Sequence, residues 1–478
     1  MAFTIWPTTP SGKAILRQYI AALTATLGLM VVGESFGWPS PTLPKLMEPG
    51  APFTINHTQI SWMVSLLYLG NMISPIPTGY LMDKFGRKRS LLYINVFSIT
   101  SWILILIAKS PVMLYIARFF AGIWIGSVTT VVPLYIGEIA QPNIRGALAN
   151  FVSMMTYFGD LFVYVIGPYV SYSSLAIIAG LVPVLFAVTF SMMPETPYFY
   201  VMHKQTDEAR KSLSWLRGDK NKDELEAELI QIDHTVTKQM ENKGRFQDIF
   251  ATRGSRKAFL IVEMLSIFLK FSGTGVIMAF ASTTLPKNAF KSLGPNECVI
   301  FLGLTWVLSA IVSSILVDKL GRKILLTVSS MGCGVAMLFA GLWFYYDQET
   351  NVDVSQINWV PFTTFIMHGV LYSLGLGPIG MGIKGEMFTA NIKALTSAIT
   401  SIVLALSSMI LNKVYLILAD TVGMYVNYWI FSISCFMAAL FTIFVVVETK
   451  GKTLQQILDE LNEKKTLRKI QILDDIDL

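Results

Sequence analysis

The sequence contains few charged residues for its length. Asp, Glu, Lys and Arg make up only 14% of its 478 residues, whereas 53% are apolar. An average soluble chain carries about 25% charged residues. The mean hydropathy is +0.56. This composition argues against an ordinary soluble globular protein and favours a chain whose solvent is the lipid bilayer.

Cysteine and histidine are also scarce, and this excludes several kinds of site. Cys298, Cys333 and Cys435 are too few and too scattered for a disulfide framework or a metal centre, and the four histidines show no ligand spacing. No Ser–His pair or paired carboxylates stand beside a convincing nucleophile, so we expect no enzyme, no cofactor and no metal. The net charge of +6 does not require nucleic acid, because cytoplasmic loops of membrane proteins carry an excess of Lys and Arg.

Long apolar stretches are abundant. A bilayer is spanned by about 20 apolar residues, and twelve stretches of that kind follow one another in two sets of six. The first set covers residues 18–38, 59–82, 90–108, 111–137, 146–171 and 174–193, and the second covers 257–284, 295–317, 324–346, 358–385, 394–418 and 424–447. The start is polar and the first stretch is of spanning length, so we expect no cleavable signal peptide.

Three charged motifs occur twice, in the same order. They are Asp83-Lys84-Phe85-Gly86-Arg87-Lys88 with Asp318-Lys319-Leu320-Gly321-Arg322-Lys323, Gly137-Glu138 leading to Arg145 with Gly385-Glu386 leading to Lys393, and Glu195-Thr196 with Glu448-Thr449. The repetition predicts two tandem halves, each a complete structural repeat.

The halves are predicted at residues 1–197 and 257–447, with cytoplasmic linker helices at 198–256 and a cytoplasmic tail at 448–478. Lys and Arg concentrate on the side that carries the N-terminus, and positive charge resists translocation. We therefore expect both termini in the cytoplasm. On this topology the sequon that begins at Asn56 lies outside the cell, where it is a glycosylation site.

These motifs resemble those of the sugar porters of the major facilitator superfamily. The resemblance is carried by the repeated Asp-x-x-Gly-Arg-Lys, by Gly137-Glu138 with Arg145, by Glu195-Thr196-Pro197, and by Glu448-Thr449-Lys450-Gly451. It covers nearly the whole chain. It implies an all-α transmembrane protein with the twelve-helix major facilitator fold, in which two six-helix halves are related by an axis along the membrane normal.

The resemblance also implies an activity. A monomer in the plasma membrane would move a sugar by alternating access, and the facilitative trehalose transporters are the nearest subgroup by the first span and the short tail. Two alternatives remain open at this stage. One is a carrier of a non-sugar, charged small solute, and the other is a nutrient sensor that binds without transporting.

Two networks at the cytoplasmic helix ends are implied by the same resemblance. A Glu and an Arg on different helices can hold those ends together and separate when the pore opens inside; single pairs are weak, but a network biases a two-state equilibrium. The alternative is that the charges only direct topology, which explains Lys and Arg but not the recurring Glu. The residues are Arg87, Glu138, Arg145 and Glu195 in one half, and Arg322, Glu386, Lys393 and Glu448 in the other.

The sugar-binding positions depart from the family. Hexose porters place Gln-Gln-x-Ser-Gly-x-Asn in the seventh span, where this chain reads Leu-Lys-Phe-Ser-Gly-Thr-Gly from Leu269. Amides supply the paired donors and acceptors that a hydroxyl-rich ligand needs, so a sugar must be held differently here. We expect a substrate cavity lined by Ser153, Thr156, Asp160, Lys270, Ser272, Thr274, Trp306 and Met381.

Charged residues at membrane depth are costly and therefore usually functional or paired. Asp160 and Lys270 either pair across the cavity or bind a charged or zwitterionic solute. Glu34 lies next to the position where proton-coupled relatives carry Asp, and Arg118 matches the Arg that partners it. The resemblance therefore leaves three alternatives: proton coupling through Glu34 and Arg118, a static ion pair between them, or a simple facilitator.

Overall fold

The computed structural model describes residues 10–48, 51–218, 222–241, 245–286, 294–452 and 454–462. Within these ranges the regular structure is helical throughout. Eleven helical stretches are long and apolar enough to cross a membrane. The helices α3 (His57–Ile73) and α4 (Pro75–Phe85), which are separated at Ser74, together form a further crossing. The predicted all-α fold with twelve spans is confirmed.

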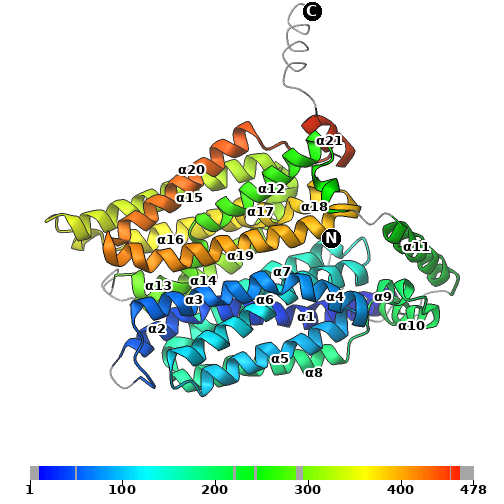
Figure 1. Ribbon diagram of the computed structural model, residues 1–478, viewed down its shortest axis with the longest axis horizontal. Helices are drawn as coiled ribbons and strands as arrows, with labels where there is room; N and C mark the ends of the chain where they lie inside the picture. Colours follow the sequence, from blue (N-terminus) through cyan, green and yellow to red (C-terminus); the bar gives the residue numbers. More distant parts are fainter. Residues whose placement is uncertain are drawn as a thin grey trace, which may run out of the picture.

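Two helical bundles lie side by side in Figure 1, one built from each half of the chain. The N-terminal bundle also contains α1 (Pro10–Gly37), α2 (Pro39–Met47), α5 (Arg87–Leu106), α6 (Pro111–Ile139), α7 (Arg145–Ile166), η1 (Gly167–Tyr169) and α8 (Tyr172–Ser191). The C-terminal bundle contains α12 (Arg253–Phe271), α13 (Thr274–Thr284), α14 (Pro295–Leu320), α15 (Arg322–Glu349), η3 (Ser355–Ile357), α16 (Val360–Leu371), the π-helical turn η4 (Tyr372–Leu376), α17 (Gly377–Gly382), α18 (Lys384–Met387), α19 (Ala390–Thr421) and α20 (Met424–Phe444).

The remaining helices gather at one end of the two bundles, which we call the linker end; the opposite end is the far end (Figure 1). They are α9 (Pro197–Met202), α10 (Thr206–Arg217), α11 (Lys222–Glu241), η2 (Phe246–Phe250) and α21 (Leu454–Asn462). Leu213 of α10 and Leu229 of α11 belong to a small apolar core of their own. The helix α21 packs on α12, where Lys257 Nζ donates to the carbonyl oxygen of Leu461 over 2.6 Å. Residues 463–478 of the predicted tail lie outside the described residues.

Glycine allows the helices of the N-terminal half to touch along their backbones. A Cβ on Gly33 of α1 would lie 1.9 Å from the carbonyl oxygen of Thr156 on α7, and a Cβ on Gly159 would lie 2.0 Å from that of Met30. Small residues allow this close approach, which is how membrane helices associate without a hydrophobic driving force. The contact fixes how α1 and α7 cross.

Several membrane crossings are interrupted near their middle or far end. Pro39 begins α2 and Pro75 begins α4, and each proline ends the preceding helix because its ring cannot continue the hydrogen-bond ladder. Between α12 and α13, Gly273 has φ +88° and packs so closely on Phe431 that a Cβ would lie 2.3 Å from the ring. Broken helices of this kind expose backbone polar groups near the centre of a carrier.

Candidate functional site

The charged turn of the N-terminal half forms a compact cluster at the linker end. Arg87, the first residue of α5, donates from Nε and Nη2 to Glu138 Oε1 over 3.2 and 2.9 Å. Glu195 accepts the backbone N–H groups of Arg87 and Lys88 over 3.0 and 2.9 Å. Its carboxylate therefore caps the N-terminus of α5, where the helix dipole favours negative charge. Gly86 is required beside it, because its φ is +94° and a Cβ would lie 2.2 Å from Glu195 Oε2.

The C-terminal half repeats this cluster. Arg322 donates to Glu386 Oε1 over 3.2 and 3.0 Å, and Glu448 accepts the backbone N–H groups of Arg322 and Lys323, each over 3.0 Å. Gly321 has φ +90° and faces the carboxylate of Glu448. The sequence repeat is therefore also a repeat of helix-capping geometry.

The two capping carboxylates, which lie outside the membrane-spanning helices, differ electrostatically. Burial raises the pKa of Glu195, and the backbone N–H donors of Thr196, Lys88 and Arg87 offset this only in part. For Glu448 burial acts in the same direction, but four backbone N–H donors outweigh it and hold its pKa below the ordinary value. The N-terminal cluster is therefore the drier of the two.

Two members of the expected networks are not brought into ion pairs among the described residues. Arg145 donates to the carbonyl oxygen of Ala140 over 3.4 Å, and Lys393 donates to that of Gly385 over 3.1 Å. The inclusion of Arg145 and Lys393 in the two networks therefore stays a prediction, and in this conformation both cations contact backbone carbonyl oxygens. Arg145 begins α7 and Lys393 lies in the first turn of α19. Each donates to a backbone carbonyl oxygen near the end of the helix before it. The clusters each hold together helix ends of one half.

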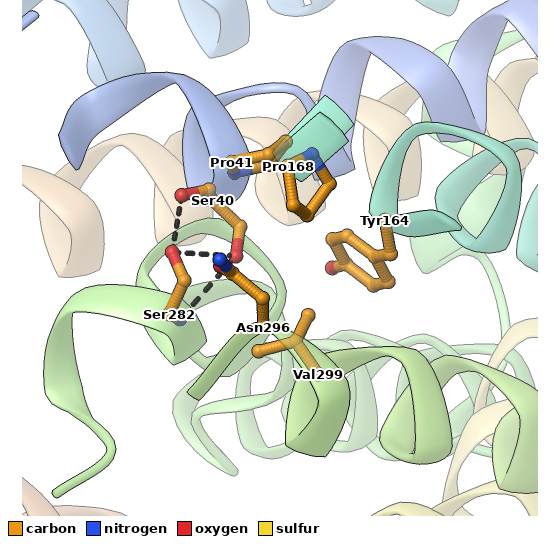
Figure 2. Close-up of a pocket in the computed structure, with 7 residues that line it drawn as sticks. All are labelled: Ser40, Pro41, Tyr164, Pro168, Ser282, Asn296 and Val299. Atoms are coloured by element: carbon orange, nitrogen blue, oxygen red, sulfur yellow. Dashed lines mark hydrogen bonds between the residues drawn. The ribbon is translucent and has the colours of Figure 1, made fainter. Parts of the chain in front are cut away.

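The far end is where the two halves meet through hydrogen bonds. Ser40 Oγ lies 3.1 Å from Ser282 Oγ, and the Tyr164 hydroxyl donates to the carbonyl oxygen of Met278 over 2.7 Å. Figure 2 shows residues of both halves around this contact, with a gap between them that admits no water molecule. Lys413 adds a further contact, with Nζ 2.9 Å from Ser61 Oγ and 4.0 Å above the Trp62 ring. These contacts close the far end.

Asp160 lies deep in the protein without a partner. Asp160 is only 1% exposed, and neither of its carboxylate oxygens accepts a hydrogen bond. Lys270, which is half-buried, forms no ion pair with it among the residues that the structure describes. The Asp160–Lys270 pair expected as one alternative is therefore absent from this conformation.

Glu34 and Arg118 are both buried but are not paired with each other. The oxygens of Glu34 have no hydrogen-bond partner. Arg118 Nη1 donates to the carbonyl oxygen of Ser35 over 2.6 Å, and its guanidinium lies 5.6 Å above the Trp38 ring. The static ion pair that was one alternative does not form here, because the backbone at Ser35 takes the position next to the guanidinium.

Ser272 and Thr274 at the α12–α13 break are bonded within the C-terminal half. Their hydroxyls lie 3.1 Å apart, and Thr274 Oγ1 lies 3.1 Å from His368 Nε2 on α16. His368 is fully buried, and it is not among the residues predicted from the sequence to line the cavity. A titratable side chain inside the tenth apolar stretch was the available signal.

The other expected cavity residues occupy different environments. Trp306 is buried, and its ring packs so closely on Gly369 that a Cβ there would lie 1.5 Å from Nε1. Tyr157 of the opposite half contacts the same indole edge-on, with ring centroids 6.2 Å apart. Thr156 is half-buried, and Ser153 and Met381 are exposed. Within the described residues no three His, Cys, Asp or Glu side chains gather into a metal site.

Comparison with known proteins places this geometry in a family. The sequence profile described as "Sugar (and other) transporter" matches residues 21–461. The "Facilitated trehalose transporter Tret1" of Polypedilum vanderplanki is 30% identical over 463 residues, which are 97% of this chain and 90% of that protein. The protein of the same name from Culex quinquefasciatus is 29% identical, over 96% of this chain and 88% of that protein. The chain spans 53% of the longer Drosophila mojavensis protein, with 29% identity over 97% of this chain.

Solved structures agree on the fold. The proton:xylose symporter XylE bound to 6-bromo-6-deoxy-D-glucose has a TM-score of 0.74 at 23% identity, covering 95% of this chain and 100% of that one. The inward-open conformation of XylE from E. coli has a TM-score of 0.76 at 23% identity, covering 92% and 99%. The family profile, the trehalose transporter relatives and the fold together show that the chain belongs to the sugar porter family of the major facilitator superfamily, whose members are multi-pass membrane transporters and not enzymes.

Proposed function

We propose that this chain carries a sugar, trehalose or hexose-like, across the plasma membrane by alternating access. One observation supports the mechanism most directly: hydrogen bonds join the halves at the far end, while the charged clusters at the linker end each stay within one half. Two rigid bodies that meet at one end can rock open there and close at the other. The names of the relatives, facilitated trehalose transporters, support the sugar.

The orientation is part of the proposal. The linker end and both termini lie in the cytoplasm, because the Lys-rich and Arg-rich turns gather there. The far end then faces outside, with the exposed Asn56 at the start of α3. Its Oδ1 accepts the N–H of Gln59 over 2.8 Å, which leaves Nδ2 free for a glycan. Glycosidase treatment of the wild type and of Asn56→Gln tests this: an identical gel mobility before and after treatment of the wild type rejects the outside assignment.

Uptake into proteoliposomes tests the transport itself. Vesicles containing purified protein should take up trehalose or glucose to equilibrium, without accumulation above the outside concentration. A matched control is the Ser40→Cys/Ser282→Cys double variant, because the two hydroxyls are 3.1 Å apart. Oxidation should lock the far end and stop uptake, and reduction should restore it. Uptake that continues at full rate in the cross-linked protein rejects alternating access at this seam.

A second candidate substrate is a charged or zwitterionic solute. Asp160 has no partner in the far-end-closed conformation and the family's sugar-binding amides are missing, which supports a ligand with its own charge. A panel of amino acids and organic anions as competitors in the same vesicles separates the two. Binding of a ligand by calorimetry without any uptake indicates the third possibility, a non-transporting sensor.

Proton coupling through Glu34 and Arg118 remains an alternative to simple facilitation. Glu34 is buried without a hydrogen-bond partner, which supports a group that changes its protonation, whereas the relatives' names support facilitation. Uptake is compared with and without an imposed proton gradient in the wild type and in Glu34→Gln. A wild type that does not respond to the gradient excludes coupling.

A further inference from the structure

Asp160 lies on the part of α7 that forms the seam between the halves. Tyr157, one turn before it, contacts Trp306 of α14. Tyr164, one turn after it, donates to Met278 of α13 and lies 2.9 Å from the position that a Cβ on Gly303 would take. The carboxylate of Asp160 points toward α1, because a Cβ on Gly37 would lie 2.9 Å from its Oδ1. Asp160 therefore lies within the stretch of α7 that contacts the C-terminal half when the far end is closed.

The surroundings of Asp160 provide no counterion. Arg118 of α6 is engaged by the carbonyl oxygen of Ser35 and the Trp38 ring. The facing stretches, which are α13 and the part of α14 from Val299 to Trp306, contain no titratable side chain. Their polar side chains are the uncharged hydroxyls of Ser and Thr. The nearest other titratable groups are Tyr68 of α3, Tyr157 and Tyr164 of α7, and Glu34 of α1, none of which is a cation. The remaining cations of the packed helices lie near helix ends: Lys13 and Arg17 in the first turns of α1, Arg145 at the start of α7, and Lys45 near the end of α2, where its Nζ donates to the carbonyl oxygens of Gly167 and Val170.

We propose that Asp160 is a proton-binding site that controls closure of the far end. Burying an ionised carboxylate without a partner is far more unfavourable than burying the uncharged acid, which leaves only an unpaired polar group. The closed seam therefore accepts Asp160 as the acid, which takes one proton from far-side water when the seam closes. The carboxylate re-forms and returns that proton when the seam opens. Linkage makes the effect reciprocal: the proton favours closure as strongly as closure favours the proton.

Glu34 does not share this position, although it too is buried without a partner. Its neighbours lie inside the N-terminal half: its backbone N is 3.0 Å from the position that a Cβ on Gly159 would take, and Arg118 bonds to the adjacent Ser35. The carboxylate of Asp160 also faces α1, but Asp160 lies on α7 between Tyr157 and Tyr164, which both contact the C-terminal half. The proposal therefore rests on that position on α7. The inference rests on the alternating access proposed above and not on the identity of the substrate.

The Ser40→Cys/Ser282→Cys pair measures closure without any transport assay. Purified protein is treated with a thiol oxidant at a series of pH values between about 5 and 8, the range in which a site linked to one proton changes closure by up to about tenfold per pH unit. With Asp160 present, cross-linking should increase as the pH falls. With Asp160→Asn, which is always uncharged, cross-linking should be high at every pH. Because thiol reactivity itself depends on pH, the ratio of the two proteins at each pH is the measured quantity.

Two matched variants make the result specific. Asp160→Glu keeps a titratable carboxyl group and should therefore keep the pH dependence of cross-linking. This variant also tests the proposal if Asp160→Asn does not fold as a monodisperse protein. Glu34→Gln should leave the pH dependence of cross-linking intact. A ratio of Asp160→Asn to wild type that does not change with pH overturns the proton site, and so does loss of the pH dependence in Glu34→Gln alone. Failure of the pair to cross-link at any pH overturns the alternating-access seam instead, and the proton site with it.

Discussion

The two copies of the charged turn bury their ion pairs to different depths, and this predicts unequal effects of the same substitution. The side chains of Arg87 and Glu138 are 6% and 14% exposed, whereas those of Arg322 and Glu386 are 20% and 35% exposed. Arg87→Ala leaves Glu138 buried without its counterion, and breaking a buried pair costs about 3–5 kcal/mol. Arg322→Ala leaves a carboxylate that water can reach, for which about 1 kcal/mol is expected.

Thermal unfolding in one detergent, followed by tryptophan fluorescence, compares the two variants. Arg87→Ala should lower the melting temperature clearly more than Arg322→Ala. Adding Glu138→Gln to Arg87→Ala should recover much of the loss, because no unpaired charge then stays buried. Adding Glu386→Gln to Arg322→Ala should recover little. Equal losses in the two single variants, or no recovery with Glu138→Gln, would refute the reasoning from burial.

Three further predictions concern packing, a hydrogen bond and pH. Gly159→Leu should abolish monodisperse protein on size exclusion by forcing α1 from α7, whereas Gly79→Leu, whose Cβ position is open, should not. His368→Leu should destabilise the protein by about 1–3 kcal/mol, because the buried hydroxyl of Thr274 then keeps only its contact with Ser272. Thr274→Val in that background should recover part of the loss. The lowered pKa of Glu448 stabilises the fold above the ordinary Glu value of about 4.3, and this contribution is lost as the pH falls through the folded-state pKa. Glu448→Gln should therefore lower the melting temperature at neutral pH and reduce its further fall on acidification.

The spans and the repeat could be read from the sequence because both are local signals. A stretch long enough to cross a bilayer is visible in any window of about 20 residues. The turn around Gly86 and its copy around Gly321 share a spacing that needs no knowledge of the fold. The structure adds why glycine is needed there: each glycine faces a carboxylate that caps the following helix.

The pairing of buried charges could not be read in the same way. The spacing of Thr156 and Asp160 places them on one helical face, but it does not say which helix that face meets. The answer depends on how α1 and α7 cross, and the backbone contacts of Gly33 and Gly159 set that crossing. Asp160 consequently points toward Gly37 of α1 and not toward Lys270.

The duplication explains which part of the mechanism the sequence reveals. Both halves keep the Arg–Glu pair and the capping Glu at the linker end, where these contacts hold the helix ends of each half together. In the proposed mechanism this lets each half move as one body. The buried groups near the seam are not duplicated: the N-terminal half contributes Asp160, and the C-terminal half contributes His368 and Trp306. The repeated motifs therefore specify the part of the structure on which the proposed rocking depends. The substrate and any link to protons depend on the residues that the halves do not share.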